Sequence, residues 1–325
     1  MLKKYLIILF AVLFCLSAVA CGKKTPKDND QSNNSSAQSL SSEHSSEEES
    51  SEENSEVSYN GIKFYGKLEN GQPISGRLDY SDNSSAYFDK ENNTITFDNG
   101  GKYVGDIDCL CRHGKGTMTY ANGDRYEGEW KDDVFNGEGV YTWADGSVYE
   151  GEFKNGVAHG RGKTIIAAAE AREGVVLEGE YKNGLADGQA TCLWDDGSKY
   201  VGAYANGMRN GYGELELSSG ETYKGNWVND KKEGADGELY YYNGDKYLGS
   251  FINDKPDTRL MDEDGNFILL ENGNHAHGEK GTYFYADGRT YTGYFQDGKI
   301  VTIESDIVGD TTPDYIYSSD ESTNG

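Results

Sequence analysis

Aromatic or glycine positions alternate with charged positions along most of this chain. In the stretch YEGEWK, residues 126–131, the two rings and the glycine stand two residues apart, with carboxylates between them. Residues two apart in a strand share a face, so the rings and glycine lie on one face and the charges on the other. A second run, residues 137–143, alternates in the same way. The pattern predicts a β-hairpin with an aromatic face and a charged face.

This hairpin pattern repeats. The first ring or aliphatic residue of each unit recurs at steps of 23, 23, 28, 23, 23, 24 and 44 residues, at Tyr103, Tyr126, Tyr149, Leu177, Tyr200, Tyr223, Tyr247 and Tyr291. A glycine stands three residues before the next unit, commonly in an Asp-Gly or Asn-Gly pair such as Asp145-Gly146. Such pairs favour tight turns with positive φ. We therefore expect tandem antiparallel hairpins joined by tight turns.

Two further features follow from the pattern within one unit. A glycine in a strand has no side chain, so a ring from a neighbouring strand can lie across it, and the aromatic face is expected to be the core. The residue before Gly137 is Asn136, and the matching residues are also types that tolerate left-handed backbone. These residues, His113 and His159 among them, are therefore assigned to turns rather than to metal binding or catalysis.

The best-matching units read YEGEFKNGVAHGRG at residues 149–162 and YVGAYANGMRNGYG at residues 200–213. They resemble the MORN repeat, Tyr-x-Gly-x-Trp-x-x-Gly-x-x-x-Gly-x-Gly. The resemblance implies an all-β fold: an elongated, single-layer antiparallel sheet of tandem hairpins with a shallow aromatic groove. It assigns residues 103–298 to a repeat array and residues 58–102 to degenerate hairpins. Family members typically associate with membranes, partner proteins or a fused catalytic domain.

The rings of the array are read first as the core of a thin sheet and second as a ligand groove. The candidate groove aromatics are Tyr126, Trp130, Trp143, Tyr149, Phe153, Tyr200, Tyr204 and Trp227. Two segments depart from the repeat. Five extra residues before Gly174 extend one hairpin, either as a lip on the groove or without function, and residues 255–275 break the pattern.

The N-terminal segment reads as a secretory leader over residues 1–20, with a charged start, an apolar run and small residues at its end. Ala18 to Cys21 resembles the lipobox of bacterial lipoproteins, in which the cysteine is diacylated, although Ala replaces the usual Leu three residues before the cysteine. An ordinary signal peptide is the alternative. The resemblance predicts a lipid anchor at Cys21 on the extracytoplasmic side of the bacterial cell membrane.

Composition separates the array from its flanks. Residues 21–57 are rich in Ser and Glu and are predicted to be a disordered tether, and residues 299–325 form an acidic tail. Only 35% of residues are hydrophobic, while Gly (43) and Tyr (25) are abundant, which favours a repeat array over two globular cores. The net charge of -26 argues against nucleic acid as a partner.

The sequence offers little catalytic chemistry. It holds no Ser-His-Asp order and no phosphate-binding glycine loop, and His275 and His277 lack a third metal ligand in suitable spacing. We expect no enzyme activity, cofactor or metal, and a role in binding or scaffolding an unknown protein or envelope component. A cell-wall glycan binder is the alternative, since short aromatic hairpins also build such repeats. An enzyme site in the non-repeating segments 255–280 or 300–325 is a third reading.

Overall fold

The computed structural model describes residues 55–59, 61–169 and 174–302. The predicted leader, the lipid site at Cys21, most of the tether and the tail from residue 303 on lie outside the described residues. The described chain divides into two compact units. The N-terminal unit holds residues 55–144 and 153–156, and the C-terminal unit holds residues 145–152 and 157–302 with the same gaps. Among the described residues, no helix is long and apolar enough to cross a membrane.

All regular elements of the described residues are β-strands. They are β1 (Ser55–Tyr59), β2 (Ile62–Glu69), β3 (Gln72–Asp79), β4 (Ser85–Asp89), β5 (Thr94–Phe97), β6 (Lys102–Asp108), β7 (Cys111–Thr119), β8 (Arg125–Lys131), β9 (Val134–Thr142), β10 (Val148–Lys154), β11 (Val157–Ile166), β12 (Val175–Lys182), β13 (Leu185–Trp194), β14 (Lys199–Ala205), β15 (Met208–Glu216), β16 (Thr222–Val228), β17 (Lys231–Lys232), β18 (Gly234–Tyr240), β19 (Lys246–Ile252), β20 (Lys255–Pro256), β21 (Gly281–Phe284), β22 (Thr290–Gln296) and β23 (Lys299–Val301).

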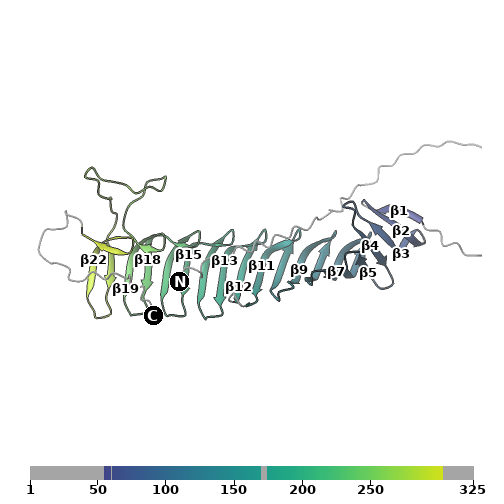
Figure 1. Ribbon diagram of the computed structural model, residues 1–325, viewed down its shortest axis with the longest axis horizontal. Coiled ribbons are helices and arrows are strands. Elements are labelled where there is room, and N and C mark those ends of the chain that lie inside the picture. Colours follow the sequence, from purple (N-terminus) through teal and green to yellow (C-terminus); the bar gives the residue numbers. More distant parts are fainter. Residues whose placement is uncertain (1–54, 60, 170–173, 303–325) are drawn as a thin grey trace, which may run out of the picture. The chain divides into compact units, whose positions relative to one another are not determined.

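Within each unit the strands pair antiparallel with their neighbours in the sequence (Figure 1). In the N-terminal unit β1 to β9 follow one another in this way. In the C-terminal unit the order runs from β11 to β16 and then through β18, β19, β21, β22 and β23, while β17 and β20 are two-residue partners of β16 and β19. The predicted all-β fold, an open antiparallel sheet of tandem hairpins, is confirmed. β1 begins at Ser55, earlier than the boundary predicted at residue 58.

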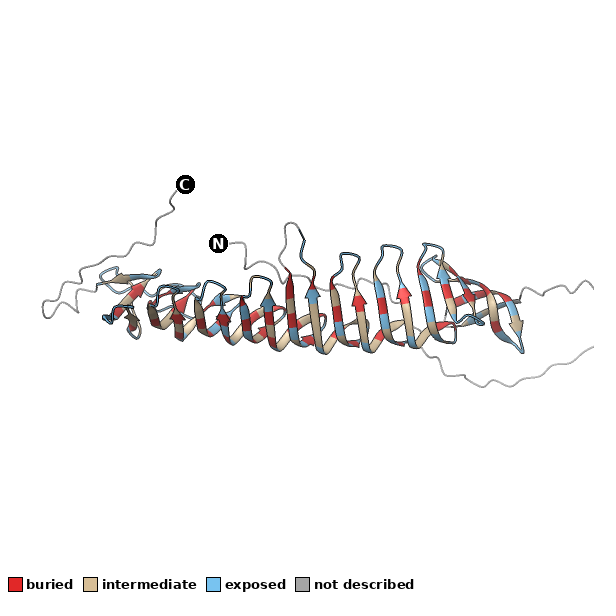
Figure 2. Ribbon diagram, turned by 90° about the horizontal axis from the view of Figure 1, so that it is seen from below, coloured by how far each residue is buried: buried red, intermediate tan, exposed pale blue. Residues whose placement is uncertain are grey.

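The core lies on the aromatic face of the hairpins, as predicted. In β8, Tyr126 and Trp130 are buried while the glutamates between them are exposed, and Figure 2 shows the same alternation of buried and exposed positions along the strands. Gly128 and Gly139 stand opposite each other in β8 and β9. The Tyr126 ring covers both, because a Cβ added at Gly139 would lie 2.5 Å from its hydroxyl oxygen. A side chain at these glycines would displace the ring that forms the core.

The turn inside each hairpin differs from the prediction. His113 and His159 lie within β7 and β11, so their assignment to turns is wrong. The β8–β9 turn is instead made by Asp132 and Asp133, with φ values of 49° and 68°. The left-handed residue expected before Gly137 is not needed, because Gly137 itself has a φ of 99°. It sits at a β-bulge, where the register shifts between Gly128 and Trp130.

Candidate functional site: the aromatic positions of the hairpins

The first tyrosine of a unit is held by its hydroxyl group. Tyr126 donates from its hydroxyl to the backbone carbonyl of Glu129, 2.8 Å away. Glu129 lies at the bulge, where the register between β8 and β9 shifts, so the phenol gives its carbonyl a donor at the point where this ladder is interrupted. Burial raises the pKa of Tyr126 well above its usual value, which keeps the phenol protonated as a donor. The same bond to the third following residue is made by Tyr103, Tyr149, Tyr200, Tyr223 and Tyr247.

The tryptophans of β8 and β16 are also satisfied inside the core. The indole N–H of Trp130 donates to the Gly116 carbonyl at 3.1 Å, and that of Trp227 donates to the Gly213 carbonyl at 3.3 Å. The Arg209 guanidinium lies 4.0 Å from the Trp227 ring centroid. It also donates through Nε to Asp230 at 2.9 Å. These polar contacts belong to the packing and leave no part of either indole facing an open groove.

Seven of the eight predicted groove aromatics are core residues, with at most 4% of the residue surface exposed: Tyr126, Trp130, Tyr149, Phe153, Tyr200, Tyr204 and Trp227. Trp143 differs. It is half-buried just after the end of β9, with its ring centroid 4.8 Å from that of Tyr141. Ligand binding by the eight rings remains a prediction, and Trp143 is the one of them that is only half-buried.

Trp143 belongs to a second series of aromatic positions. The residue three places before each turn glycine, or before the positive-φ residue Asn83 in the first case, is half-buried in every described example. We call these series the edge columns: Tyr80, Phe97, Tyr120 and Trp143 in the N-terminal unit, and Trp194, Leu217, Tyr241 and Tyr285 in the C-terminal unit. Each stands where a strand ends, so neighbouring hairpins cover only part of it.

The turn beside an edge-column residue is built in the same way in both units. The Tyr120 N–H donates to the Asp124 carbonyl at 2.8 Å, and the Tyr241 N–H donates to the Asp245 carbonyl at 2.9 Å. The two carboxylates accept a further tyrosine hydroxyl, from Tyr141 in one case and Tyr283 in the other, each at 2.8 Å. The edge-column rings therefore stand on fixed turns.

The pKa of Asp245 favours the charged carboxylate that holds its turn together. Burial alone would raise the pKa of the Asp245 carboxyl, but hydrogen bonds from the Ala286 N–H and the Tyr283 hydroxyl outweigh it and hold the pKa below its usual value. The carboxylate is therefore ionised at neutral pH and remains an acceptor for both donors. Sequence reasoning found only Trp143 of the edge columns. The signal that identifies the others is a large apolar residue at a fixed distance before each turn glycine.

Little in the described residues suggests catalysis. No group of three or more His, Cys, Asp or Glu side chains is placed there to hold a metal ion. The acidic segment DEDGN, residues 262–266, is a tight turn, because the Asp262 carboxylate accepts the N–H groups of Asp264 and Asn266. The His277 ring forms a hydrogen bond with the Thr258 hydroxyl group, with 2.8 Å between Nδ1 and Oγ1.

The charged face of the C-terminal unit has an open hollow of about 600 Å³. It is lined by opposite charges that include Glu152, Arg161, Glu180 and Lys182. The Glu152 carboxylate already accepts the Arg161 backbone N–H at 2.8 Å. The Glu152 side chain at the hollow thus already takes part in a contact within its hairpin.

The hairpin repeat, with its ring-over-glycine core and half-buried residues at the strand ends, defines a class of β-repeat protein. Six consecutive segments match the family model of the MORN repeat: residues 112–125, 126–148, 149–167, 178–199, 200–222 and 223–246. Residues 112–246 thus carry MORN repeats, as the sequence predicted.

A comparison with curated proteins found no match. Among solved structures, the SAS-4 TCP domain of Drosophila melanogaster, in complex with a proline-rich motif, is similar at 12% identity and a TM-score of 0.29, over 56% of this chain and 85% of that one. The TCP10 domain of Danio rerio CPAP, in complex with a peptide, has 12% identity and a TM-score of 0.21, over 69% and 100%. A streptogramin B lyase has 10% identity and a TM-score of 0.14, over 74% and 81%.

Proposed function

We propose that this chain is a non-catalytic binding module that holds a protein partner at the bacterial cell envelope through its edge columns. The observation that supports this most is the recurrence of half-buried large residues beside the turns between hairpins. Six of these eight residues are Tyr or Trp, whose rings carry a hydroxyl or an indole N–H. Partly exposed Tyr and Trp side chains on a fixed scaffold are typical anchors of protein interfaces. MORN repeats are generally binding modules, for proteins or for membranes.

The charge of the chain favours a protein over a membrane as the partner of the array. With a net charge of -26, attraction to anionic headgroups is unfavourable. Membrane association is assigned instead to the N-terminus, where Cys21 follows small residues at the end of an apolar leader. A lipid at this cysteine would keep the module at the extracytoplasmic surface. Replacing Cys21 by Ser should move the protein from the membrane fraction to the soluble fraction.

The test of partner binding is proximity labelling from the anchored full chain in its own envelope. The edge variant changes Trp143, Trp194 and Tyr241 to Ala, and the control changes Tyr87 and Tyr212 to Ala, which are exposed aromatics outside the edge columns. We expect neighbours labelled by the wild type to be lost with the edge variant and kept with the control. An identical set of labelled neighbours for the edge variant would contradict the proposal.

A glycan-binding role is the second candidate, and one observation favours it. Two of the four tryptophans, Trp143 and Trp194, are half-buried in the edge columns, and indole faces of this kind can stack on sugar rings. Pull-down of the full chain on purified peptidoglycan and wall polysaccharide tests this role. Binding that is lost in the Trp143→Ala, Trp194→Ala double variant supports the glycan reading, and no binding by the wild type excludes it.

A further inference from the structure

The segment between β20 and β21 leaves the sheet of the C-terminal unit and rises from it as two loops (Figure 1). Its sequence has an eight-residue period that the hairpin pattern conceals, in RLMDEDGN at 259–266 and FILLENGN at 267–274, and a seven-residue stretch follows, HAHGEKG at 275–281. We call the three stretches octads, the third being one residue short. Three antiparallel bridges each join the third residue of one octad to the first residue of the next, and the third octad returns to the first in the same way: Met261 with Phe267, Leu269 with His275, and His277 with Arg259. The three octads therefore close on one another.

Hydrogen bonds at the centre of the segment form a ring. The Leu260 N–H donates to the Ala276 carbonyl at 2.9 Å, the Ala276 N–H to the Ile268 carbonyl at 2.8 Å, and the Ile268 N–H to the Leu260 carbonyl at 3.0 Å. Three arms meet at this ring. Two end in tight turns at Gly265 and Gly273, and the third leads back into the sheet. We call residues 258–278 the three-way junction.

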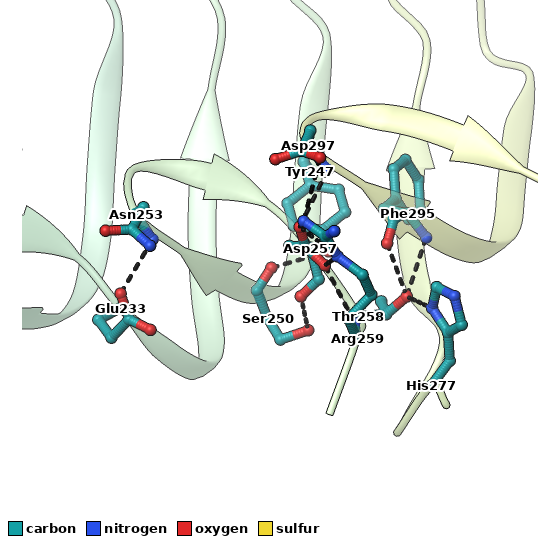
Figure 3. Close-up of polar contacts among 10 residues, drawn as sticks. All are labelled: Glu233, Tyr247, Ser250, Asn253, Asp257, Thr258, Arg259, His277, Phe295 and Asp297. Atoms are coloured by element: carbon teal, nitrogen blue, oxygen red, sulfur yellow. Dashed lines mark hydrogen bonds and ion pairs between the residues drawn. The ribbon is translucent and has the colours of Figure 1, made fainter. Parts of the chain in front are cut away.

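The stem of the junction is fixed to the sheet by buried polar contacts (Figure 3). The Asp257 side chain is 1% exposed and forms an ion pair with Arg259, whose Nη2 lies 2.7 Å from Oδ2. Asp257 also accepts the Asp297 backbone N–H at 2.9 Å. Thr258 Oγ1 accepts the Phe295 N–H at 2.9 Å, which ties the stem to β22. The junction is thus a built projection with a defined orientation on its unit.

One face of the junction is apolar and open. Five of the thirteen exposed large hydrophobic residues lie within residues 260–270. The alternation of an extended strand places Leu260, Ile268 and Leu270 on one side. These side chains are 43%, 39% and 48% exposed. We call them the junction face.

The other side of the junction is occupied by contacts of its own. The Arg259 guanidinium lies 3.8 Å from the Phe267 ring centroid. The Phe267 ring in turn packs edge-on to His275, with centroids 5.5 Å apart. Its own residues therefore cover part of this side, where Met261 and Leu269 remain 38% and 59% exposed. The acidic charges around the junction face are what distinguish the kind of partner that it can take.

Charges around the junction face are negative. Five exposed carboxylates stand on the two turns and beside the stem, at Asp262, Glu263, Asp264, Glu271 and Glu279. The cations nearby are Arg259, which is paired with Asp257 and Asp297, and Lys280. A second copy of the face would bring like charges together, and an anionic lipid surface would do the same. The rim is complementary to a cationic partner.

We propose that the junction face binds a segment of a partner protein that presents apolar side chains flanked by Lys or Arg. The apolar side chains of that segment cover Leu260, Ile268 and Leu270, and its cations meet the carboxylates of the rim. This inference rests on the proposed binding function, but it uses a surface separate from the edge columns. The two surfaces can therefore fail independently.

The test measures the affinity of the full chain for three fluorescent synthetic peptides of equal length: alternating Leu-Lys, alternating Leu-Glu and alternating Ser-Lys. The junction variant changes Leu260, Ile268 and Leu270 to Ser. The control variant changes Leu193 and Val201 to Ser, which are 46% and 43% exposed on β13 and β14. We expect the Leu-Lys peptide to bind the wild type and the control equally, and the junction variant at least about tenfold more weakly.

Several results would overturn the proposal. Equal binding of the Leu-Lys peptide to the junction variant and the wild type would do so, as would equal affinity for the Leu-Glu or Ser-Lys peptide. So would self-association in sedimentation, or binding to phosphatidylglycerol vesicles, that disappears in the junction variant, because the occupant would then be a second copy or a membrane. Thermal unfolding confirms that each variant is folded. The edge variant should bind the Leu-Lys peptide as the wild type does, whether or not it has lost its labelled neighbours.

Discussion

At the residue scale, Tyr126 stabilises the bulge of its hairpin in two ways. Its ring fills the space above Gly128 and Gly139, and its hydroxyl group satisfies the Glu129 carbonyl. The Tyr126→Phe variant keeps the first contribution and removes the second. Since a hydrogen bond contributes roughly 1 kcal/mol net, this variant should lower the free energy of unfolding by about that amount.

Urea titration of the wild type and the variant measures this effect. Tyr212→Phe is the matched control, because Tyr212 is 57% exposed and lies outside the core, so its midpoint should not change. An unchanged midpoint for Tyr126→Phe would show that the hydroxyl group contributes nothing to the bulge.

The buried ion pair at the stem of the three-way junction has a pH signature. Burial works to raise the pKa of Asp257, but hydrogen bonds from Arg259 and the Asp297 N–H outweigh it, and the net pKa lies below the usual value. A carboxyl group whose pKa is lowered in the folded state stabilises the fold above the unfolded pKa, about 4. This contribution is lost as the pH falls from there through the folded pKa.

The Asp257→Asn variant should therefore cost about 3 kcal/mol at neutral pH, since it leaves Arg259 without its buried partner. The difference from the wild type should shrink as the pH falls below about 4. Denaturant titrations at several pH values measure both quantities. A difference that is constant from neutral to acid pH would mean that the charge of Asp257 does not support the stem.

At the element scale, the β12–β13 hairpin departs from the others in two positions at once. Leu177 replaces the first tyrosine, and Ala190 stands opposite Gly179 where the other hairpins have a second glycine. In a regular hairpin the tyrosine hydroxyl lies within 2.2–2.5 Å of where a Cβ at that glycine would be, as for Tyr200 and Gly213 or Tyr126 and Gly139. The alanine and the leucine therefore compensate each other.

A double-mutant cycle tests this compensation. Leu177→Tyr alone should destabilise the chain by about 1–3 kcal/mol, because the ring meets the Ala190 methyl group. Adding Ala190→Gly opens the space, so the double variant should recover most of this loss, with a clear coupling energy between the two changes. Additive effects of the two substitutions in denaturant titrations would refute the compensation.

The hairpins show what the sequence could predict and what it could not. Two-residue alternation and the Asp-Gly turns were sufficient for the strands and for the core rings, because both are local signals. The position of the inner turn was missed. Asp132-Asp133 in the β8–β9 hairpin is not a typical pair, but Asn155-Gly156 and Asn206-Gly207 make the same turn in other hairpins, so the signal was present there. The difference in burial between Trp143 and the other seven candidate groove aromatics was not predicted either, because alternation assigns a face but not the cover that neighbouring hairpins provide.

The three-way junction was missed for a different reason. Its octads are too short to form hairpins with a recognisable alternation, and the bridge between Arg259 and His277 joins residues from the first and third octads. The signal was nevertheless present, in the Gly-Asn pairs Gly265-Asn266 and Gly273-Asn274, eight residues apart. A search for short periods, in addition to the longer hairpin period, would have found it.

At the scale of the whole molecule, two classes of ring have two different roles. Rings at the start and middle of a hairpin form the core, and rings just before the turn between hairpins form the accessible edge columns. The four tryptophans of the chain divide equally between these classes. Trp130 and Trp227 are 3% and 0% exposed, and Trp143 and Trp194 are half-buried.

Fluorescence quenching of single-tryptophan variants tests this division most directly. Each variant keeps one tryptophan and changes the other three to Phe, and its thermal unfolding is recorded to show that it is folded. Acrylamide should quench Trp143 and Trp194 several times more strongly than Trp130 and Trp227. Equal and strong quenching of Trp130 and Trp227 would place these rings on an open groove and contradict the account of the core.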